Sequence, residues 1–223
     1  MYVDGVPQGN VFSYGSDLYD LEAVEILKGP QGSRFGKLAP GGSINLITRK
    51  PGNEQSSEIA ASYGTFNTQK YILSNSGPLV EEFSYAMGVQ RSASDGFLNN
   101  NSGRDNDSET WNGRLTFHWD GGAGTKATLG ASFTSHELGA QPLVLRNQSD
   151  LYSRNVNTLD EKTNIEQNQQ FFKFEQETDL GLLTSITNRN DWDMNPNLLD
   201  IDFAFGTFTS TILQEQALSL IHI

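Results

Sequence analysis

The sequence predicts a mainly β protein whose strands pair in antiparallel order. From residue 56 onward, apolar and polar residues alternate in segments of about ten residues, which is the period of a strand with two different faces. In the stretch 110–119 two tryptophans, a leucine and a phenylalanine share one face, and polar side chains occupy the other. The stretches 82–92 and 125–136 repeat the pattern. Each predicted strand therefore has one apolar face.

The lengths of the connections between these strands favour a membrane barrel. Short turns are expected at 76–81, 120–125 and 178–181, and long polar connections at 94–109, 138–166 and 195–205. Outer-membrane β-barrels have short turns at one end and long loops at the other, and their apolar faces meet lipid. In that arrangement Trp111 and Trp119 would lie in two interfacial belts. A soluble β-sandwich gives the same alternation and stays open as the alternative.

Residues 24–48 place glycines and prolines between two short apolar runs, and the runs alternate as half-buried strands do. The spacing of a phosphate-binding P-loop and the dinucleotide fingerprint are both absent. The clustered residues are therefore predicted to be turn positions where φ is fixed or positive. They are Gly29, Pro30, Gly32, Gly36, Gly41 and Gly42. Residues 16–24 before them predict a short helix that begins at Ser16 or Asp17.

The composition excludes several classes of function. The 27 acidic residues against 15 basic ones give a formal net charge of -12, which repels a nucleic acid. The chain has no cysteine, so a disulfide framework and a thiolate metal site are excluded. No apolar run is long enough for a membrane helix.

The order of the parts resembles that of the TonB-dependent outer-membrane receptors. The motif "VEILKGP" precedes the glycine cluster, "GGSINLITRKP" follows it, and a β-meander begins at "IAASYGTFNTQ". The resemblance implies that residues 1–50 are the C-terminal part of a plug domain. Residues 51–217 would then be the N-terminal strands of an incomplete antiparallel transmembrane β-barrel, about eight strands of a family with 22.

The resemblance also implies the function, partners and location of the protein. Such a receptor lies in the bacterial outer membrane, in contact with lipid, and TonB of the inner-membrane complex pulls its plug to admit a scarce ligand, commonly a ferric siderophore. This implies a transporter with no catalytic residues and no cofactor. Glu25 matches the usual acid of the plug motif, whereas Lys28 stands where the family most often has arginine. The glycines would let the plug backbone turn sharply against the barrel wall.

The same resemblance predicts that the chain is a fragment. The signal peptide, the TonB-contacting box and the first half of the plug would precede residue 1, and eight strands are too few to close the barrel. Residues 218–223 also match what a commonly used transposon adapter encodes in one reading frame. We therefore expect this tail to be non-native, with an ordinary apolar strand end as the alternative.

Ligand contacts in this family come from plug apices, and the segment 8–15 falls where an apex would be. Gln8, Asn10, Phe12 and Tyr14 are the candidates, because aromatic and amide side chains suit a flat, oxygen-rich chelate. An ordinary polar turn is the alternative reading of this segment.

A metal site is not predicted. Asp191, Asp193, Asn195 and Asp202 approach the spacing of a calcium loop, but its turn glycine and its final glutamate are missing, so a solvated loop is expected. His118 is expected to line the inner, polar face. Two other functions stay open: a soluble carbohydrate-binding sandwich, and glycoside hydrolysis by the same aspartates.

Overall fold

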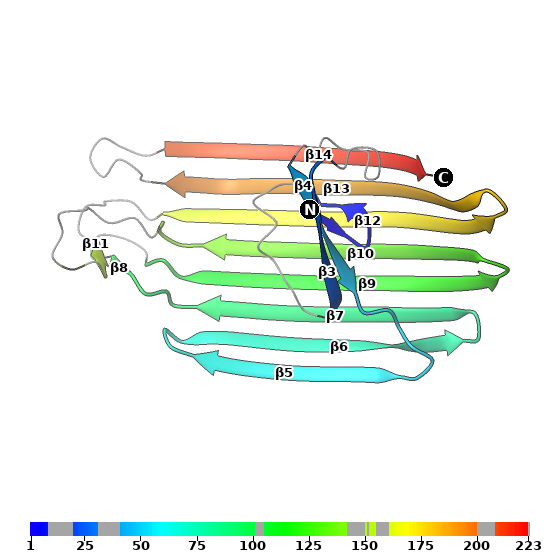
Figure 1. The fold of residues 1–223 in the computed structure, drawn as a ribbon. Helices are drawn as coiled ribbons and strands as arrows, with labels where there is room; N and C mark the ends of the chain where they lie inside the picture. Colours follow the sequence, from blue (N-terminus) through cyan, green and yellow to red (C-terminus); the bar gives the residue numbers. More distant parts are fainter. Residues whose placement is uncertain are drawn as a thin grey trace.

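The computed structural model describes residues 1–8, 20–30, 41–100, 105–141, 150, 152–154, 161–199 and 208–222. Every regular element in these ranges is a β-strand. The strands form one large sheet, one small sheet and a two-stranded ladder (Figure 1). In this part of the chain no helix is long and apolar enough to cross a bilayer.

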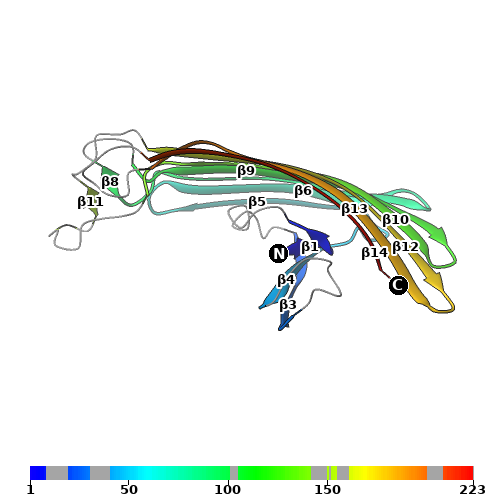
Figure 2. The same cartoon turned by 90° about the horizontal axis from the view of Figure 1, so that it is seen from above.

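The large sheet contains eight strands, and each neighbouring pair is antiparallel. Its order is β14-β13-β12-β10-β9-β7-β6-β5, so the strands of this sheet follow their order along the chain, with β8 and β11 in the connections. The sheet is curved, and the small sheet lies on its concave side (Figure 2). The strands are β5 (Ser56–Gly64), β6 (Thr68–Val80), β7 (Phe83–Ser94), β9 (Ser108–Gly122), β10 (Thr125–Leu138), β12 (Lys162–Thr178), β13 (Gly181–Leu199) and β14 (Phe208–His222).

The connections alternate in length as expected, although several boundaries differ from the prediction. The connection expected to reach residue 166 ends at 161, because β12 begins at Lys162. The turn after β6 begins at residue 81 and not at 76, because a bulge between Pro78 and Val80 lets the strand continue. Residues 195–199 belong to β13 and not to a loop, since a similar irregularity between Met194 and Asn197 carries the pairing onward. The long connections are 95–107, 139–161 and 200–207, and the first two contribute β8 (Asn99–Asn100) and β11 (Ser153–Arg154) to a parallel ladder.

The polarity of the large sheet is inverted relative to that of a soluble protein. On β9 the side chains of Leu115 and Phe117 are 39% and 42% exposed, whereas Asn112 and Thr116 on the opposite, concave face are 3% and 4% exposed. A β-sandwich would bury the leucine and expose the threonine. The described residues contain no second sheet over the apolar face, so the sandwich alternative is wrong.

Aromatic side chains mark the two ends of this outward apolar face. Trp111 shares a row with Tyr71 and Arg91 near the long loops, and the Arg91 guanidinium carbon lies 5.7 Å from the Trp111 ring centroid. Trp119 lies near the short turns, 6.4 Å from the ring of Phe83. The two tryptophans are eight positions apart on β9, about 27 Å along the strand. Because strands in a barrel are tilted, this length fits an apolar band about 25 Å tall.

The small sheet contains β1 (Tyr2–Val3), β2 (Val6–Pro7), β3 (Leu21–Lys28) and β4 (Gly42–Thr48), in the order β2-β1-β4-β3. Asp4 and Gly5 join β1 to β2 with φ values of 51° and 80°, as a tight hairpin turn requires. The predicted helix over 16–24 is wrong from Leu21 onward, because these residues pair with β4. Residues 16–19 lie outside the described residues.

The glycine cluster is described at its two ends only. Gly29 directly follows β3 and has a φ of 83°, and Gly42 begins β4 with a φ of 131°. A Cβ on Gly42 would lie 2.3 Å from the backbone oxygen of Leu27, so a side chain cannot fit there. Gly32 and Gly36 lie outside the described residues. Glycine is thus required at position 42, where β4 begins beside the end of β3, and Gly29 and Gly42 both have a positive φ.

The three tryptophans provide a test of orientation. Trp192 is 3% exposed on the concave face, packed with Ile165 and Met194, whereas Trp111 is 42% exposed on the other face. In lipid vesicles, single-tryptophan variants that keep Trp111 or Trp119 should be quenched by brominated acyl chains, most strongly with bromines near the headgroups. The variant that keeps Trp192 should stay unquenched. Equal quenching of Trp192 and Trp111 would contradict the assignment of the faces.

A charge placed on the outward face should be costly. We expect Leu115→Arg to destabilise the protein by about 2 to 4 kcal/mol in a bilayer, because the guanidinium would lie in hydrocarbon. Thr128→Arg, on the concave face of the adjacent strand, loses a hydrogen bond to His118 and should cost about 1 kcal/mol. Urea titration of the protein in lipid vesicles measures both values. Similar costs for the two variants would count against a lipid-facing sheet.

Candidate functional site between the two sheets

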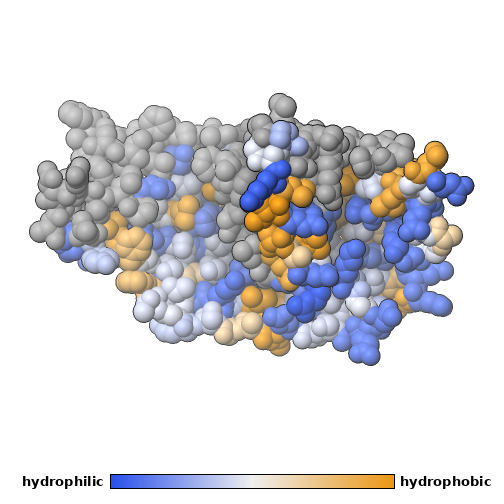
Figure 3. Space-filling model, in the orientation of Figure 1, coloured by the Kyte–Doolittle hydropathy of each residue, from blue (hydrophilic) through white to orange (hydrophobic). Residues whose placement is uncertain are grey.

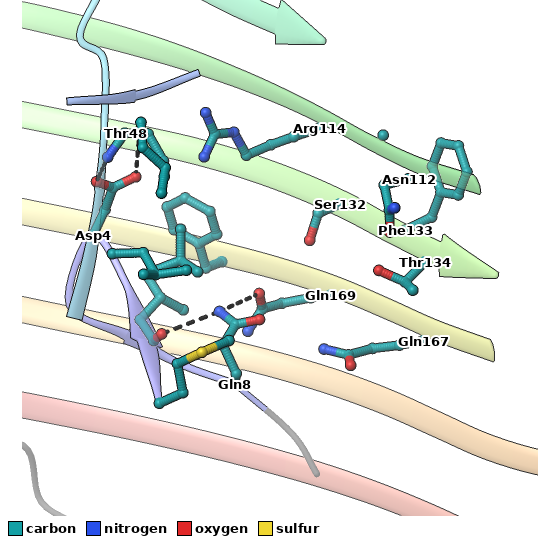
Figure 4. A pocket seen from close by; sticks show the side chains of 17 residues that line it. Asp4, Gln8, Thr48, Asn112, Arg114, Ser132, Phe133, Thr134, Gln167 and Gln169 are labelled. Carbon is teal, nitrogen blue, oxygen red and sulfur yellow. Dashed lines mark hydrogen bonds between the residues drawn. The ribbon is translucent and has the colours of Figure 1, made fainter. Parts of the chain in front are cut away.

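Neutral amide groups hold the small sheet against the concave face of the large one. Gln169 of β12 donates from Nε2 to the Pro7 carbonyl at 2.9 Å, and Asn188 of β13 donates from Nδ2 to the same oxygen at 3.3 Å. Gln8 in turn donates from Nε2 to Gln169 Oε1 at 3.2 Å (Figure 4). The end of the small sheet is therefore fixed to two neighbouring strands of the wall.

The small sheet is itself braced by polar side chains. Asp4 accepts hydrogen bonds from the backbone N–H of Thr48 at 2.9 Å and from its hydroxyl at 2.7 Å. Asn45 accepts from the Gly5 N–H at 3.0 Å and donates to Glu25 Oε2 at 3.1 Å. The predicted motif residue Glu25 thus helps to hold β3, β4 and the first hairpin together.

A second contact between the sheets is ionic. Asp20, just before β3, lies 4.0 Å from Arg114 of β9 and 3.6 Å from Arg49, and its side chain is only 14% exposed. Burial raises the pKa of the Asp20 carboxyl above its ordinary value of 3.8, although both arginines act to lower it and Glu58 adds to the rise. Desolvation therefore outweighs the attraction, as expected for a partly buried pair with long contacts.

Two cavities lie between the sheets. The smaller is about 90 Å³ and is lined by side chains of both sheets, among them Gln8, Asn112 and Arg114 (Figure 4). Both amide atoms of Asn112 are buried and lack a protein partner within the described ranges, so the cavity offers hydrogen-bonding groups. The larger is about 870 Å³, faces the short-turn end, and is lined by Lys50, Lys173 and several carboxylates. The wall side of both cavities mixes polar side chains with aromatic ones, and Phe171 lines both.

Of the four predicted ligand contacts, only Gln8 lies among the described residues. Gln8 is at the contact between the sheets, where its amide nitrogen donates to Gln169 Oε1 and to the Val6 carbonyl, each at 3.2 Å. Asn10, Phe12 and Tyr14 lie outside the described residues. Lys28 ends β3, and Pro30 and Gly41 flank the part of the glycine cluster that is not described.

The aspartates near residue 191 were expected to lie in a solvated loop, but the structure places Asp191 and Asp193 on a strand. Asp191 accepts from its neighbour Arg189 on β13, with the closest contact at 3.2 Å, and Asp193 follows on the same strand. Asp202 lies outside the described residues, and no cluster of acidic, histidine or cysteine side chains suited to a metal occurs within the described ranges. His118 lies on the concave face between the hydroxyls of Thr116 and Thr128, at 3.1 and 3.2 Å.

Sequence reasoning missed the first hairpin and the wall residues that bind it. The dipeptide Asp4-Gly5 between two apolar residues is a strong hairpin signal and could have revealed β1 and β2. Gln169 and Asn188 gave no such signal, because an inward amide on a strand looks the same whether it meets water or another sheet.

Comparison with known proteins identifies both sheets. Residues 1–43 match the family model described as the TonB-dependent receptor plug domain. The chain is 34% identical over 101 residues to the pesticin receptor of Yersinia pestis, which covers 45% of this chain and 15% of the relative. It is 38% identical over 65 residues to a catecholate siderophore receptor of Escherichia coli, covering 29% of the chain and 8% of the relative. The chain spans a small part of the length of these curated relatives.

Solved structures share the fold of almost the whole chain. The ferric yersiniabactin uptake receptor of Yersinia pestis has a TM-score of 0.77 at 19% identity, over 98% of this chain and 34% of that one. The ferripyoverdine receptor of the outer membrane of Pseudomonas aeruginosa has a TM-score of 0.69 at 20% identity, over 96% of the chain and 31% of that one.

The chain belongs to the TonB-dependent receptor family. The small sheet corresponds to the end of a plug, and the large sheet corresponds to part of the barrel wall. The relatives and solved structures named above are receptors, and none of their names describes an enzyme. The outward apolar face of the wall is thereby the lipid-facing one, and the contact between the sheets is the contact between plug and wall.

The raised pKa of Asp20 predicts a specific pH dependence. The folded state favours the protonated carboxyl, so the contribution of this group to stability is complete below about pH 3.8 and is lost as the pH rises through its folded pKa. The backbone N–H of Arg49 donates to the Asp20 carbonyl at 3.0 Å and reports on the local structure. Its hydrogen-exchange protection, corrected for the intrinsic rate, should fall with rising pH.

The matched variant for this test is Asp20→Asn. Its amide does not titrate, so the protection of the Arg49 N–H should become independent of pH over the same window. A wild-type protection that rises with pH would show that the arginine pairs, and not burial, dominate at Asp20.

Proposed function

We propose that the protein carries out TonB-dependent, energy-coupled uptake of a ferric siderophore across the bacterial outer membrane. The observation that carries the proposal is the docking of a plug-type sheet on the polar concave face of a wall whose other face is apolar. A plug held in this way blocks the lumen until it is moved. Because the chain holds no nucleotide-binding motif, the energy would come from TonB and its inner-membrane complex.

The substrate class is supported by the relatives. Those named above include a catecholate siderophore receptor and a ferric yersiniabactin uptake receptor, and a further relative of 40% identity over 83 residues is a metal-pseudopaline receptor of Pseudomonas aeruginosa. All of these ligands are metal chelates. We propose that Gln8, Asn10, Phe12 and Tyr14 contact the chelate, with rings to stack on it and amides to hydrogen-bond its oxygens.

The division of the chain follows from the same proposal. Residues 1–50 would act as the end of the plug and residues 51–217 as wall strands, with the linker at 49–55 between the two sheets. The backbone of residues 218–222 pairs with β13, which supports a strand in this position whatever the origin of the tail.

Iron uptake provides the test. Cells that carry the full-length parent receptor of this chain as their sole receptor should take up radioactive iron from one of three chelates: ferric yersiniabactin, ferripyoverdine or a ferric catecholate. Uptake should fall to background in cells without TonB. At limiting chelate, Phe12→Ala or Tyr14→Ala should lower the rate by up to about tenfold, which is the worth of one aromatic contact.

Tyr63→Ala is the matched control, because Tyr63 is exposed on the lipid-facing side of β5. It should leave uptake unchanged. Uptake that persists without TonB, or no uptake of any of the three chelates, would overturn the proposed function.

A further inference from the structure

We infer that Gln169 is a positioning residue that, together with Asn188, fixes the start of the segment proposed to contact the ligand. The four residues Pro7, Gln8, Gln169 and Asn188 are here called the Pro7 clamp. The clamp couples the end of β2 in the plug to two adjacent wall strands, β12 and β13.

Two wall side chains donate to the same Pro7 carbonyl oxygen. A carbonyl oxygen has two lone pairs, and the Pro7 oxygen receives one donor from each wall strand, at 2.9 and 3.3 Å. The two donors are neighbours on the wall, because Gln169 pairs with Asn190 and Asn188 lies two residues from it on the same face. A single backbone atom is therefore held from two sides.

Gln169 donates and accepts at the same time. Its Nε2 binds the Pro7 carbonyl, and its Oε1 receives the Nε2 of Gln8. A side-chain amide can do both at neutral pH, whereas a carboxylate accepts only and an ammonium donates only. Gln169 and Asn188 are 3% and 5% exposed, so neither side chain can readily replace a lost partner with bulk water.

The clamp is placed where the chain leaves the plug sheet. Pro7 ends β2, and its ring fixes φ, which removes one backbone degree of freedom at this point. Gln8 is further tied by its backbone N–H to the Met1 carbonyl at 3.0 Å. On the other side of the hairpin, Gly5 packs near Ile186 of β13, at a distance that leaves room for little more than a methyl group. The hairpin therefore fits closely on the wall.

The consequence for ligand binding rests on the proposed function. If residues 8–14 contact the chelate, the Pro7 clamp fixes the position where that segment starts. It thereby lowers the entropy cost of ordering the segment when the ligand binds. Loss of the clamp should then weaken ligand affinity without changing the number of sites. The structural part of the inference stands apart from the ligand.

Hydrogen exchange of the protein in its outer membrane tests the structural part. Gln169→Met keeps the length of the side chain but neither donates nor accepts, and Gln169→Glu accepts but cannot donate. In both variants the backbone of residues 1–8 should exchange about tenfold faster, which is the worth of a buried hydrogen bond. Asn188→Ala should give a smaller increase, because its contact is longer.

Gln170→Met is the matched control, because Gln170 is the next residue of β12 and is exposed on the opposite face. It should leave the exchange of residues 1–8 unchanged. A positioning role also requires that β12 itself exchange at the wild-type rate in Gln169→Met. Wild-type exchange at residues 1–8 in both Gln169 variants would overturn the inference, as would equal loosening of β12 and the plug peptide.

A binding titration with ferric yersiniabactin separates this inference from the proposed function. In Gln169→Met the dissociation constant should rise by at least about threefold at an unchanged number of sites, which is within the range for one buried hydrogen bond. If the wild-type protein does not bind this probe while the exchange results hold, the choice of ligand fails and the clamp stands. An unchanged dissociation constant with faster exchange would refute the link between the clamp and binding.

Discussion

The structure depends on one constraint: in hydrocarbon, each backbone N–H and C=O must find its partner within the protein. In the large sheet, the strands from β6 to β13 meet this constraint by antiparallel pairing on both sides, and β5 and β14 are the two edge strands of the described sheet. Once the ladder is fixed, the two-residue period of a strand assigns each side chain to lipid or to the concave side. Leu115 and Thr116 differ by one position and have opposite environments for this reason. The space-filling view shows, over the small sheet, how apolar and polar groups mix on the concave side (Figure 3).

The same constraint explains why the wall can hold a plug. A face that turns away from lipid is free to carry amides, hydroxyls and a few charges, and β9, β12 and β13 do so. The plug meets these groups with backbone carbonyls and polar side chains. Hydrogen bonds give direction as well as attraction, so they fix the register of the small sheet where an apolar contact would let it slide.

Sequence predicted those features that depend on local periodicity, and missed those that depend on contact between distant segments. The alternation over 110–119 predicted both faces of β9, whereas Gly42, which was predicted at a turn, begins strand β4 with a positive φ. The helix over 16–24 was wrong because pairing with β4 overrides the local propensity of Leu21 and its neighbours. The partner of Pro7 could not be predicted, since Gln169 is 162 residues away and its amide carries no signature of what it will meet.

The chemistry of the contact between plug and wall decides how readily it can be exchanged for water. A neutral hydrogen bond contributes about 1 kcal/mol net, because water replaces the lost partner when both groups become solvated. A buried ion pair behaves differently, since separating it inside the protein leaves an unpaired charge in a poor solvent. The described contact uses amides at the Pro7 clamp and only one long pair, Asp20 with Arg114, whose carboxyl already has a raised pKa. Such a contact orders the plug while it is docked and does not hold it by a strong charge pair. Separation of the plug from the wall would therefore break neutral hydrogen bonds and no strong buried charge pair.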